Sequence, residues 1–200
     1  MTSRTNKIIG AVVAIAIILS VAVLIYVNLP KSTEKDHTTP PNKNHPDFTL
    51  IYNDKTQNFT LGQIERLEPY TAKGGYRTQK PSIKGVGNYT GVNITTLIHT
   101  LDPVPYRYSL QVTDENGVTA SYNFSTIQGQ VNIYNPDNAS DPNPIRIGNL
   151  TMVLAYQFEG NPLNISSDGK LKIVFLDEQG SITQSSLWWY KVVSIRVITE

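Results

Sequence analysis

The sequence predicts a mainly β domain of the α+β class with two short helices, preceded by one transmembrane helix. Three observations support this prediction. Residues 8–29 are an uncharged apolar run, residues 30–46 are rich in proline, and residues 47–200 alternate short apolar runs with turn residues. Short strands with few helical windows are typical of a β-rich domain. We therefore predict a cytoplasmic tail at 1–7, an anchor at 8–29, an extended linker at 30–46 and an extracytoplasmic domain at 47–200.

The apolar run from Ile8 to Leu29 is long enough to cross a bilayer. At ~1.5 Å per residue it would span ~33 Å, close to the ~30 Å of a hydrocarbon core. A cleaved signal peptide is the alternative, but its apolar region is shorter and ends in small residues, whereas this run ends in Tyr26-Val-Asn-Leu-Pro30. Arg4 and Lys7 precede the run, with no acidic residue before it. This bias predicts a single-pass cell-membrane protein with its N-terminus in the cytoplasm and its C-terminal domain outside.

Composition excludes several classes of function. The chain has 17 Lys+Arg and 16 Asp+Glu, so its net charge is +1 and no nucleic-acid surface is predicted. It has no cysteine, which excludes disulfides, thiolate metal sites and a cysteine nucleophile. Of its three histidines, His37 and His45 fall in the linker and His99 in the domain. No metal ligand and no catalytic residue is therefore assigned.

The domain is rich in Asn-x-Ser/Thr sequons, which are acceptors for N-glycosylation. Sequons without cysteine fit an archaeal cell surface better than a eukaryotic secreted domain, which usually carries disulfides. The alternative is that a Thr- and Asn-rich β protein generates sequons by chance. The candidate glycosylation sites are Asn58, Asn88, Asn93, Asn123, Asn138, Asn149 and Asn164.

The first part of the domain is predicted to form a strand at 48–52 and then a short helix. Thr60 is a typical N-cap residue, and Leu61, Ile64 and Leu67 share one face of the helix that follows.

A second short helix is predicted at 93–101, after a glycine-rich segment. Beyond it, the dipeptide Asn116-Gly117 predicts a type I′ hairpin turn, because both residues tolerate positive φ. A loop rich in Pro, Asn and Asp is expected at 135–144, and a turn at 159–161. The predicted strands are 106–113, 118–124, 131–134, 150–158, 171–176 and 188–198.

Several short segments also follow one another in a recognisable order. They are Phe59-Thr-Leu-Gly-Gln-Ile64, Tyr89-Thr-Gly-Val92, Asp114-Glu-Asn-Gly117, Val153-Leu-Ala-Tyr156 with Glu159-Gly-Asn-Pro-Leu163, Gly169-Lys-Leu-Lys-Ile-Val174 and Tyr190-Lys-Val-Val-Ser-Ile-Arg-Val197. In this order they resemble the elements of the sulfite-oxidase-type molybdopterin-binding domain family, over most of residues 48–200. The resemblance implies the fold of that family, and it makes molybdopterin the cofactor to consider.

The chain departs from that family at the metal. The family holds molybdenum through one cysteine, in the segment that corresponds here to 70–88, and this chain has none. Ser82 is the one serine in that segment, and a hydroxyl is a harder ligand than a thiolate. We therefore predict a divergent member that acts as a non-redox binding or interaction module. Two alternatives stay open: a molybdopterin-dependent oxidoreductase with a non-cysteine ligand, and a glycosylated cell-surface adhesion or structural domain.

The most site-like segment is 74–87, which is rich in glycine and basic residues. Glycines would let the backbone approach a ligand, and basic side chains suit an anionic small molecule. In the family this region borders the cofactor pocket. The alternative to a binding site is a solvated surface loop with no ligand. If the segment does bind, the alternative to an anionic small molecule is a cell-surface protein. The predicted ligand-binding residues are Tyr76, Arg77, Lys80, Lys84, Tyr89 and Lys191, the last by its place in the final strand.

Three consecutive aromatic residues, Trp188, Trp189 and Tyr190, precede the last apolar run. On an extended segment they alternate between faces, so at least one should point outward. Such a residue would be open to a sugar or a partner, and the alternative is that the aromatics belong to the core and to an edge that protects it.

Overall fold

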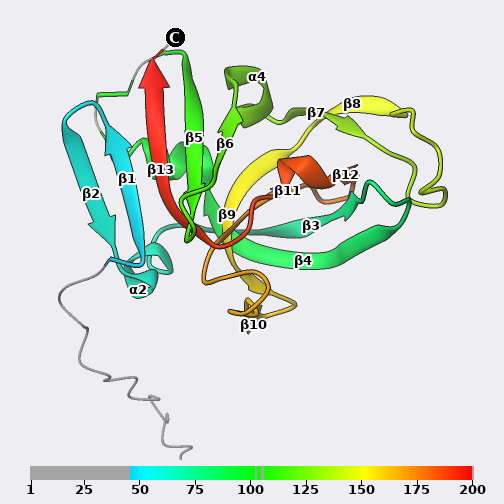
Figure 1. Cartoon of the computed structure of the whole chain (residues 1–200), viewed down its shortest axis with the longest axis horizontal. Coiled ribbons are helices and arrows are strands. Elements are labelled where there is room, and N and C mark those ends of the chain that lie inside the picture. Colours follow the sequence, from blue (N-terminus) through cyan, green and yellow to red (C-terminus); the bar gives the residue numbers. More distant parts are fainter. Residues whose placement is uncertain (1–45, 102, 105, 200) are drawn as a thin grey trace, which may run out of the picture. The chain divides into compact units, whose positions relative to one another are not determined.

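The computed structural model describes residues 46–101, 103–104 and 106–199 (Figure 1). The predicted tail and anchor, and the linker up to residue 45, lie outside these residues. Within the described part, no helix is long and apolar enough to cross a membrane. This part is mainly β with three short α-helices, as the sequence predicts for the class.

The first sheet has five strands (Figure 1). The first strand, β1, pairs in parallel with the last, β13, and the other neighbours are antiparallel. This pairing brings the two ends of the domain together at the centre of the sheet. In spatial order the strands are β2 (Lys55–Phe59), β1 (Phe48–Tyr52), β13 (Val192–Thr199), β5 (Tyr108–Asp114) and β6 (Thr119–Tyr122).

The second sheet contains the longest strands, which run side by side in Figure 1. Its order is β10 (Asn161–Pro162), β9 (Thr151–Phe158), β4 (Ile83–Asn93), β3 (Pro69–Arg77) and β12 (Ile182–Gln184), and β11 (Lys172–Leu176) also pairs with β9. A separate two-stranded sheet consists of β7 (Gln130–Ile133) and β8 (Arg146–Asn149).

The helices are short and begin at polar caps. Helix α2 (Leu61–Ile64) starts at Thr60, which forms a capping box with Gln63. Helix α3 (Ile94–Ile98) starts at Asn93, as predicted, although it ends earlier than 101. The predicted strand at 118–124 instead ends at Tyr122, because Asn123 caps a helix that was not predicted, α4 (Phe124–Ile127). One 3₁₀ turn, η1, covers Ser185–Leu187.

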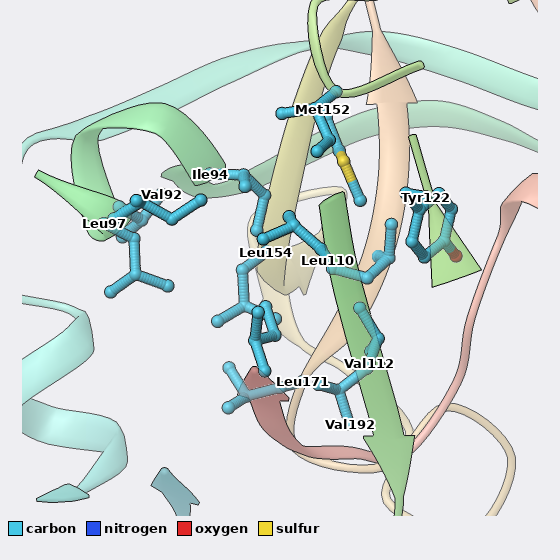
Figure 2. Packing of buried hydrophobic residues seen from close by; sticks show 14 of the residues in the cluster. Val92, Ile94, Leu97, Leu110, Val112, Tyr122, Met152, Leu154, Leu171 and Val192 are labelled. Carbon is cyan, nitrogen blue, oxygen red and sulfur yellow. The ribbon is translucent and has the colours of Figure 1, made fainter. Parts of the chain in front are cut away.

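The main core lies between the two sheets, with α3 packed against it (Figure 2). Each sheet contributes alternate residues, as the period of two requires. The first sheet supplies Leu110 and Val112 of β5, and the second supplies Met152 and Leu154 of β9. The residues labelled in Figure 2 are all buried.

A second, smaller core covers the other face of β9 and β11. Here Val153 and Ala155 alternate with the main-core residues of β9, and Val174 and Leu176 do the same on β11. Both strands are therefore buried on both faces, which explains their nearly continuous apolar sequences. The second core is completed by Ala72, Tyr89, Leu163 and Trp188.

The structure corrects the expected loop at 74–87. This segment lies largely in strands β3 and β4, which pair as an antiparallel hairpin with a bulge between Gly74 and Tyr76. Its glycines and lysines hid the strand pattern, because residues of this kind are depleted in strands. Strands β2, β8 and β12 were also not predicted, being polar or short.

The structure differs from two local predictions, the type of one turn and the start of the final strand. Of the residues in the turn after Asp114, only Gly117 has a positive φ, so the turn is not type I′. The Asp114 carboxylate accepts the backbone N–H groups of Asn116 and Val118, which favours this alternative turn. The final strand begins at Val192 instead of 188, because Lys191 adopts a left-handed φ of 55°.

Candidate ligand-binding site

The candidate site is built around Lys172, the first residue of β11. All five residues of this strand are buried, and Lys172 is its one charged residue. Because side chains alternate along a strand, Lys172 shares a face with Val174 and Leu176 of the second core. Its side chain is only 4% exposed. A buried ammonium needs compensation from its neighbours.

Four aromatic rings surround the Lys172 ammonium. Nζ lies 4.2 Å from the ring centroid of Tyr190 and 5.3 Å from that of Trp188. The centroids of Tyr89 and Tyr76 are 5.5 Å and 5.7 Å away. All four distances fall within the ~6 Å range of cation–π attraction. We call these four residues the aromatic cage.

The cage is fixed by its own contacts. The Trp188 ring centroid lies 5.0 Å from that of Tyr76 and 5.3 Å from that of Tyr89. The Trp188 indole donates to Thr183 Oγ1 at 2.7 Å, and the Tyr89 hydroxyl donates to the Gly85 carbonyl at 2.9 Å. The rings are therefore held before any ligand arrives.

Asp168 supplies the counter-charge. Lys172 Nζ donates to Asp168 Oδ1 at 2.8 Å, and the Ser167 hydroxyl donates to Asp168 Oδ2 at 2.8 Å. The Asp168 carbonyl accepts the backbone N–H of Lys191 at 2.7 Å. This bond ties the loop between β10 and β11 to the start of β13. The Asp168 side chain is 21% exposed, so the pair reaches from the interior to the surface.

Burial changes the acid–base properties of this cluster. Removal from water lowers the pKa of Lys172 below its ordinary value of 10.5, and the hydrogen bond and charge of Asp168 oppose this change. Removal from water also raises the pKa of Tyr89 and of Tyr190, and nearby Asp168 acts in the same direction on both. Both phenols therefore stay protonated at neutral pH.

A cavity of about 480 Å³ opens beside the cage. This volume lies within the ~300–1,000 Å³ typical of ligand pockets. Two carboxylates and one ammonium face it, so its formal charge is −1. Its apolar wall is formed by Tyr76, Tyr89, Phe158, Leu163 and Tyr190, and its polar wall by Glu159, Asn161, Asn164, Ser167, Asp168 and Lys172.

Two glycines of β4 make room for the cavity wall. A Cβ on Gly85 would lie 2.7 Å from Tyr76 Cε1, and Gly85 has a positive φ of 60°. A Cβ on Gly87 would lie 2.4 Å from Glu159 Oε1 and 2.5 Å from Phe158 Cε2. The sequence suggested that these glycines leave room for a ligand. In the structure, the space beside them is filled by the protein's own side chains.

Glu159 reaches the cavity from a two-residue turn between β9 and β10. It has a φ of 49°, an uncommon conformation for a residue other than glycine, and Gly160 beside it has a φ of 72°. Its carboxylate Oε1 accepts the backbone N–H of Asn88 at 2.7 Å. The turn is thus fastened to β4, and Glu159 is held as a lining residue of the cavity.

The structure places the six sequence-predicted residues in different surroundings. Tyr76 and Tyr89 both line the cavity and belong to the cage. Lys80 and Lys84 are exposed and do not line it. The Lys191 backbone lies next to Asp168, but its side chain does not line the cavity, and its Nζ pairs with Glu115 Oε1 at 2.5 Å. A shared anion site of all six residues stays a prediction that this geometry does not favour.

Arg77 points away from the cage because it follows Tyr76 on the same strand. Its guanidinium Nε donates to the Ala139 carbonyl at 2.6 Å and lies over the Tyr134 ring, 5.4 Å from the centroid. Arg77 is 9% exposed, so these contacts fasten the 135–144 loop.

None of the seven sequon asparagines is buried. Four of them, however, use the side-chain oxygen to accept a nearby backbone N–H, as caps or turns. Asn–x–Ser/Thr is a natural sequence for such caps, which gives these four sequons a structural reason independent of glycosylation. They are Asn93, Asn123, Asn138 and Asn164.

Several site residues were not predicted from the sequence. Lys172 carried one usable signal, a single charge at the start of an otherwise apolar strand. Asp168 and Glu159 carried none, because acids in turns are ordinary. The aromatic triplet alternates as expected: Trp188 enters the cage, Trp189 packs on the main core and Tyr190 lines the cavity.

These residues do not fit a molybdopterin cofactor. Ser82, the one serine in the segment where the family carries its cysteine, hydrogen-bonds with Thr78 Oγ1 at 2.9 Å and does not line the cavity. The family's cofactor is anionic, whereas the cavity presents two carboxylates and one ammonium that Asp168 already neutralises. Among the described residues, no three His, Asp or Glu side chains are grouped to hold a metal ion.

Comparison with known proteins supports the fold. No family model and no curated protein matches the chain. Among solved structures, the sulfane dehydrogenase SoxCD from Paracoccus pantotrophus is similar, with a TM-score of 0.52 at 14% sequence identity. The match covers 77% of this chain and 39% of that chain, so this chain corresponds to less than half of its neighbour's length. At this identity the likeness concerns the fold, and it supports the sulfite-oxidase-like fold that the sequence resemblance predicts.

Proposed function

We propose that this protein is a membrane-anchored, extracytoplasmic binding module without redox activity, and that its ligand occupies the cavity beside Lys172. One observation supports this most: the buried Lys172 ammonium, paired with the partly exposed Asp168, sits in an aromatic cage beside a cavity of about 480 Å³.

The pair is poorly explained by stability alone. A buried ion pair often contributes no more than apolar residues of the same volume, because both charges lose their hydration. Position 172 is surrounded by apolar residues of the second core, so an apolar side chain would pack there. A polar group retained at a cavity wall is typical of sites that orient a ligand.

The oxidoreductase alternative lacks a metal ligand at this site. The chain has no cysteine, and the Ser82 hydroxyl is engaged with Thr78 at the end of the β3–β4 hairpin. The adhesion alternative is favoured by the fact that none of the sequon asparagines is buried, and it does not account for the cage.

Metal and pterin analysis separates the binding module from the oxidoreductase. The full-length protein would be purified from its native membrane and analysed for molybdenum and tungsten, with pterin fluorescence after oxidative release. We expect neither metal nor pterin in stoichiometric amount. Stoichiometric metal together with pterin would contradict the proposal and establish a non-cysteine ligand.

The proposed anchor rests on the uncharged run 8–29 and the basic residues before it. In intact cells, external protease should remove residues 47–200 from the full-length protein and leave the anchor in the membrane fraction. Complete protection of the domain in intact cells, with digestion after lysis, would contradict the outside location.

A further inference from the structure

We propose that the cavity beside Lys172 binds a neutral saccharide. This inference rests on the proposed function and names the ligand class of the same site. It depends on three properties of the cavity: its charge, the arrangement of its rings and the hydrogen-bonding groups left on its polar wall.

Charge disfavours ionic ligands of both signs. An anion would approach the carboxylates of Glu159 and Asp168, while the single ammonium is already paired with Asp168. A cationic ligand would seek the aromatic cage, but Lys172 occupies it with Nζ 4.2 Å from the Tyr190 centroid. The cavity is therefore matched best by a ligand without net charge.

The apolar wall suits the C–H faces of a sugar ring. Aromatic faces are electron-rich, so they attract weakly positive C–H groups. Tyr89 and Phe158 form a tilted pair with centroids 4.6 Å apart and an interplanar angle of 41°. Tyr76 and Tyr190 meet at 84°, with centroids 6.5 Å apart. These pairs form no parallel slot for a flat heterocycle, and Tyr76, Phe158 and Tyr190 stay partly exposed to offer apolar surface to a puckered ring.

The polar wall keeps hydrogen-bonding capacity for hydroxyl groups. An ammonium has three donors, and Asp168 accepts one from Lys172. Asn164 uses its Oδ1 for the Ser166 and Ser167 backbone N–H groups, which leaves its Nδ2 donors. Asn161 donates from Nδ2 to the Glu159 carbonyl, which leaves its Oδ1 as an acceptor. The polar wall thus offers both donors and acceptors beside an apolar wall, as a polyhydroxy ligand requires.

The experiment uses full-length protein in detergent and ligand-observed saturation-transfer NMR. The saccharide probes are maltose, cellobiose, lactose and N,N′-diacetylchitobiose, and the other classes are represented by inorganic phosphate, tetramethylammonium and adenosine. The variants are Tyr190→Ala, its matched control Tyr190→Phe, Lys172→Met, and Lys84→Ala outside the cavity. Thermal unfolding checks that each variant is folded.

We expect saturation transfer to the ring C–H protons of at least one saccharide. Tyr190→Ala should weaken its binding by ~10-fold or more, because the stacking ring is lost, while Tyr190→Phe should stay within ~2-fold. Lys172→Met should also weaken binding, and Lys84→Ala should leave it unchanged. If Tyr190→Ala fails to fold, the saccharide affinities of Lys172→Met and Lys84→Ala are compared instead, and weaker binding by Lys172→Met alone places the sugar in the cavity.

Three results would overturn the inference. Binding of phosphate, tetramethylammonium or adenosine that Lys172→Met weakens, with no saccharide bound, would contradict the saccharide and leave the binding module standing. Saccharide binding that is insensitive to both Tyr190→Ala and Lys172→Met would place the sugar elsewhere. Absence of binding by every probe would count against the ligand class and the proposed function together.

Discussion

The Lys172 ammonium lies 4.2 Å from the centroid of the Tyr190 ring, and the two residues come from segments on either side of η1. Lys172 begins β11, whereas Tyr190 stands just before β13, where the left-handed Lys191 redirects the chain. Gly169 packs so closely on Lys191 that a Cβ there would lie 2.5 Å from its Cα. The backbone around 169–172 and 190–191 therefore holds the cation and the ring together.

Removing Asp168 should cost more stability than removing Lys172. Asp168→Asn leaves a buried ammonium without its carboxylate, and we expect a loss of about 2–3 kcal/mol, below the ~3–5 kcal/mol of fully buried pairs because Asp168 is partly exposed. Lys172→Met removes the charge and keeps the length of the side chain, so its cost should stay within ~1 kcal/mol. Urea unfolding of the full-length variants measures both.

The double variant is the control for this pair. Adding Lys172→Met to Asp168→Asn should restore most of the lost stability, because the unpaired charge is gone. If Asp168→Asn alone is no more destabilising than Lys172→Met, the ammonium is not buried as described.

The stability of the fold should depend on pH through Lys172. Its folded-state pKa lies below 10.5, so between these two values the unfolded chain binds more protons than the folded chain. The free energy of unfolding therefore rises with pH across that window, and this dependence vanishes below the folded-state pKa. Tyr89 and Tyr190 act oppositely above their ordinary pKa of 10, because only the unfolded phenols ionise there.

Lys172→Met tests this dependence directly. Urea midpoints measured at about pH 8 to 10 should rise more steeply for the wild type than for the variant. Parallel profiles would mean that Lys172 titrates at its ordinary pKa in the folded protein.

Gly85 should be intolerant of a side chain. Gly85→Ala forces a left-handed φ on alanine, at a cost of ~1–2 kcal/mol, and drives a Cβ to 2.7 Å from the Tyr76 ring. Gly117→Ala is the matched control, because Gly117 also has a positive φ of 80° and has nothing within 4 Å of its Cβ. We expect Gly85→Ala to be the more destabilising in thermal unfolding and to perturb tyrosine fluorescence. Equal effects would show that Gly85 does not shape the cavity wall.

A glycan on Asn164 would stand at the mouth of the cavity. Ser166→Ala removes this sequon while the turn survives, since Asn164 Oδ1 accepts the backbone N–H of residue 166. Ser140→Ala removes the Asn138 sequon in the same kind of turn, away from the cavity. We expect each variant to lose one glycan in intact-mass analysis, and only Ser166→Ala to bind more tightly the saccharide probe that the wild type binds. An unchanged mass for Ser166→Ala would show that Asn164 carries no glycan.

Local signals predicted much of the fold. The Thr60 cap, the start of a helix at Asn93, the strand at 48–52 and the apolar strands β9 and β11 follow from patterns within a few residues. The β3–β4 hairpin did not, because glycines that are weak in isolated strands are required here by close packing of side chains against them.

The sequence predicted only some of the residues of the site. Tyr76 and Tyr89 were predicted to bind a ligand and do line the cavity. Arg77 was grouped with them by its charge, and strand alternation turns it to the opposite face. The partners Lys172 and Asp168 come together with the tyrosines only through sheet pairing, which no local pattern encodes.

The central claim, that the cavity beside the aromatic cage is a binding site, is tested most directly by the Trp188 indole. The chain has two tryptophans, so ¹⁵N-tryptophan labelling of the full-length protein gives two indole signals, assigned with Trp189→Phe. Trp188 stands in the cage, 5.3 Å from Lys172 Nζ, whereas Trp189 packs on the main core. The account predicts that at least one of the four saccharide probes, phosphate, tetramethylammonium and adenosine shifts the Trp188 signal alone, and that Lys172→Met reduces the shift. A Trp188 signal unmoved by every probe would contradict it.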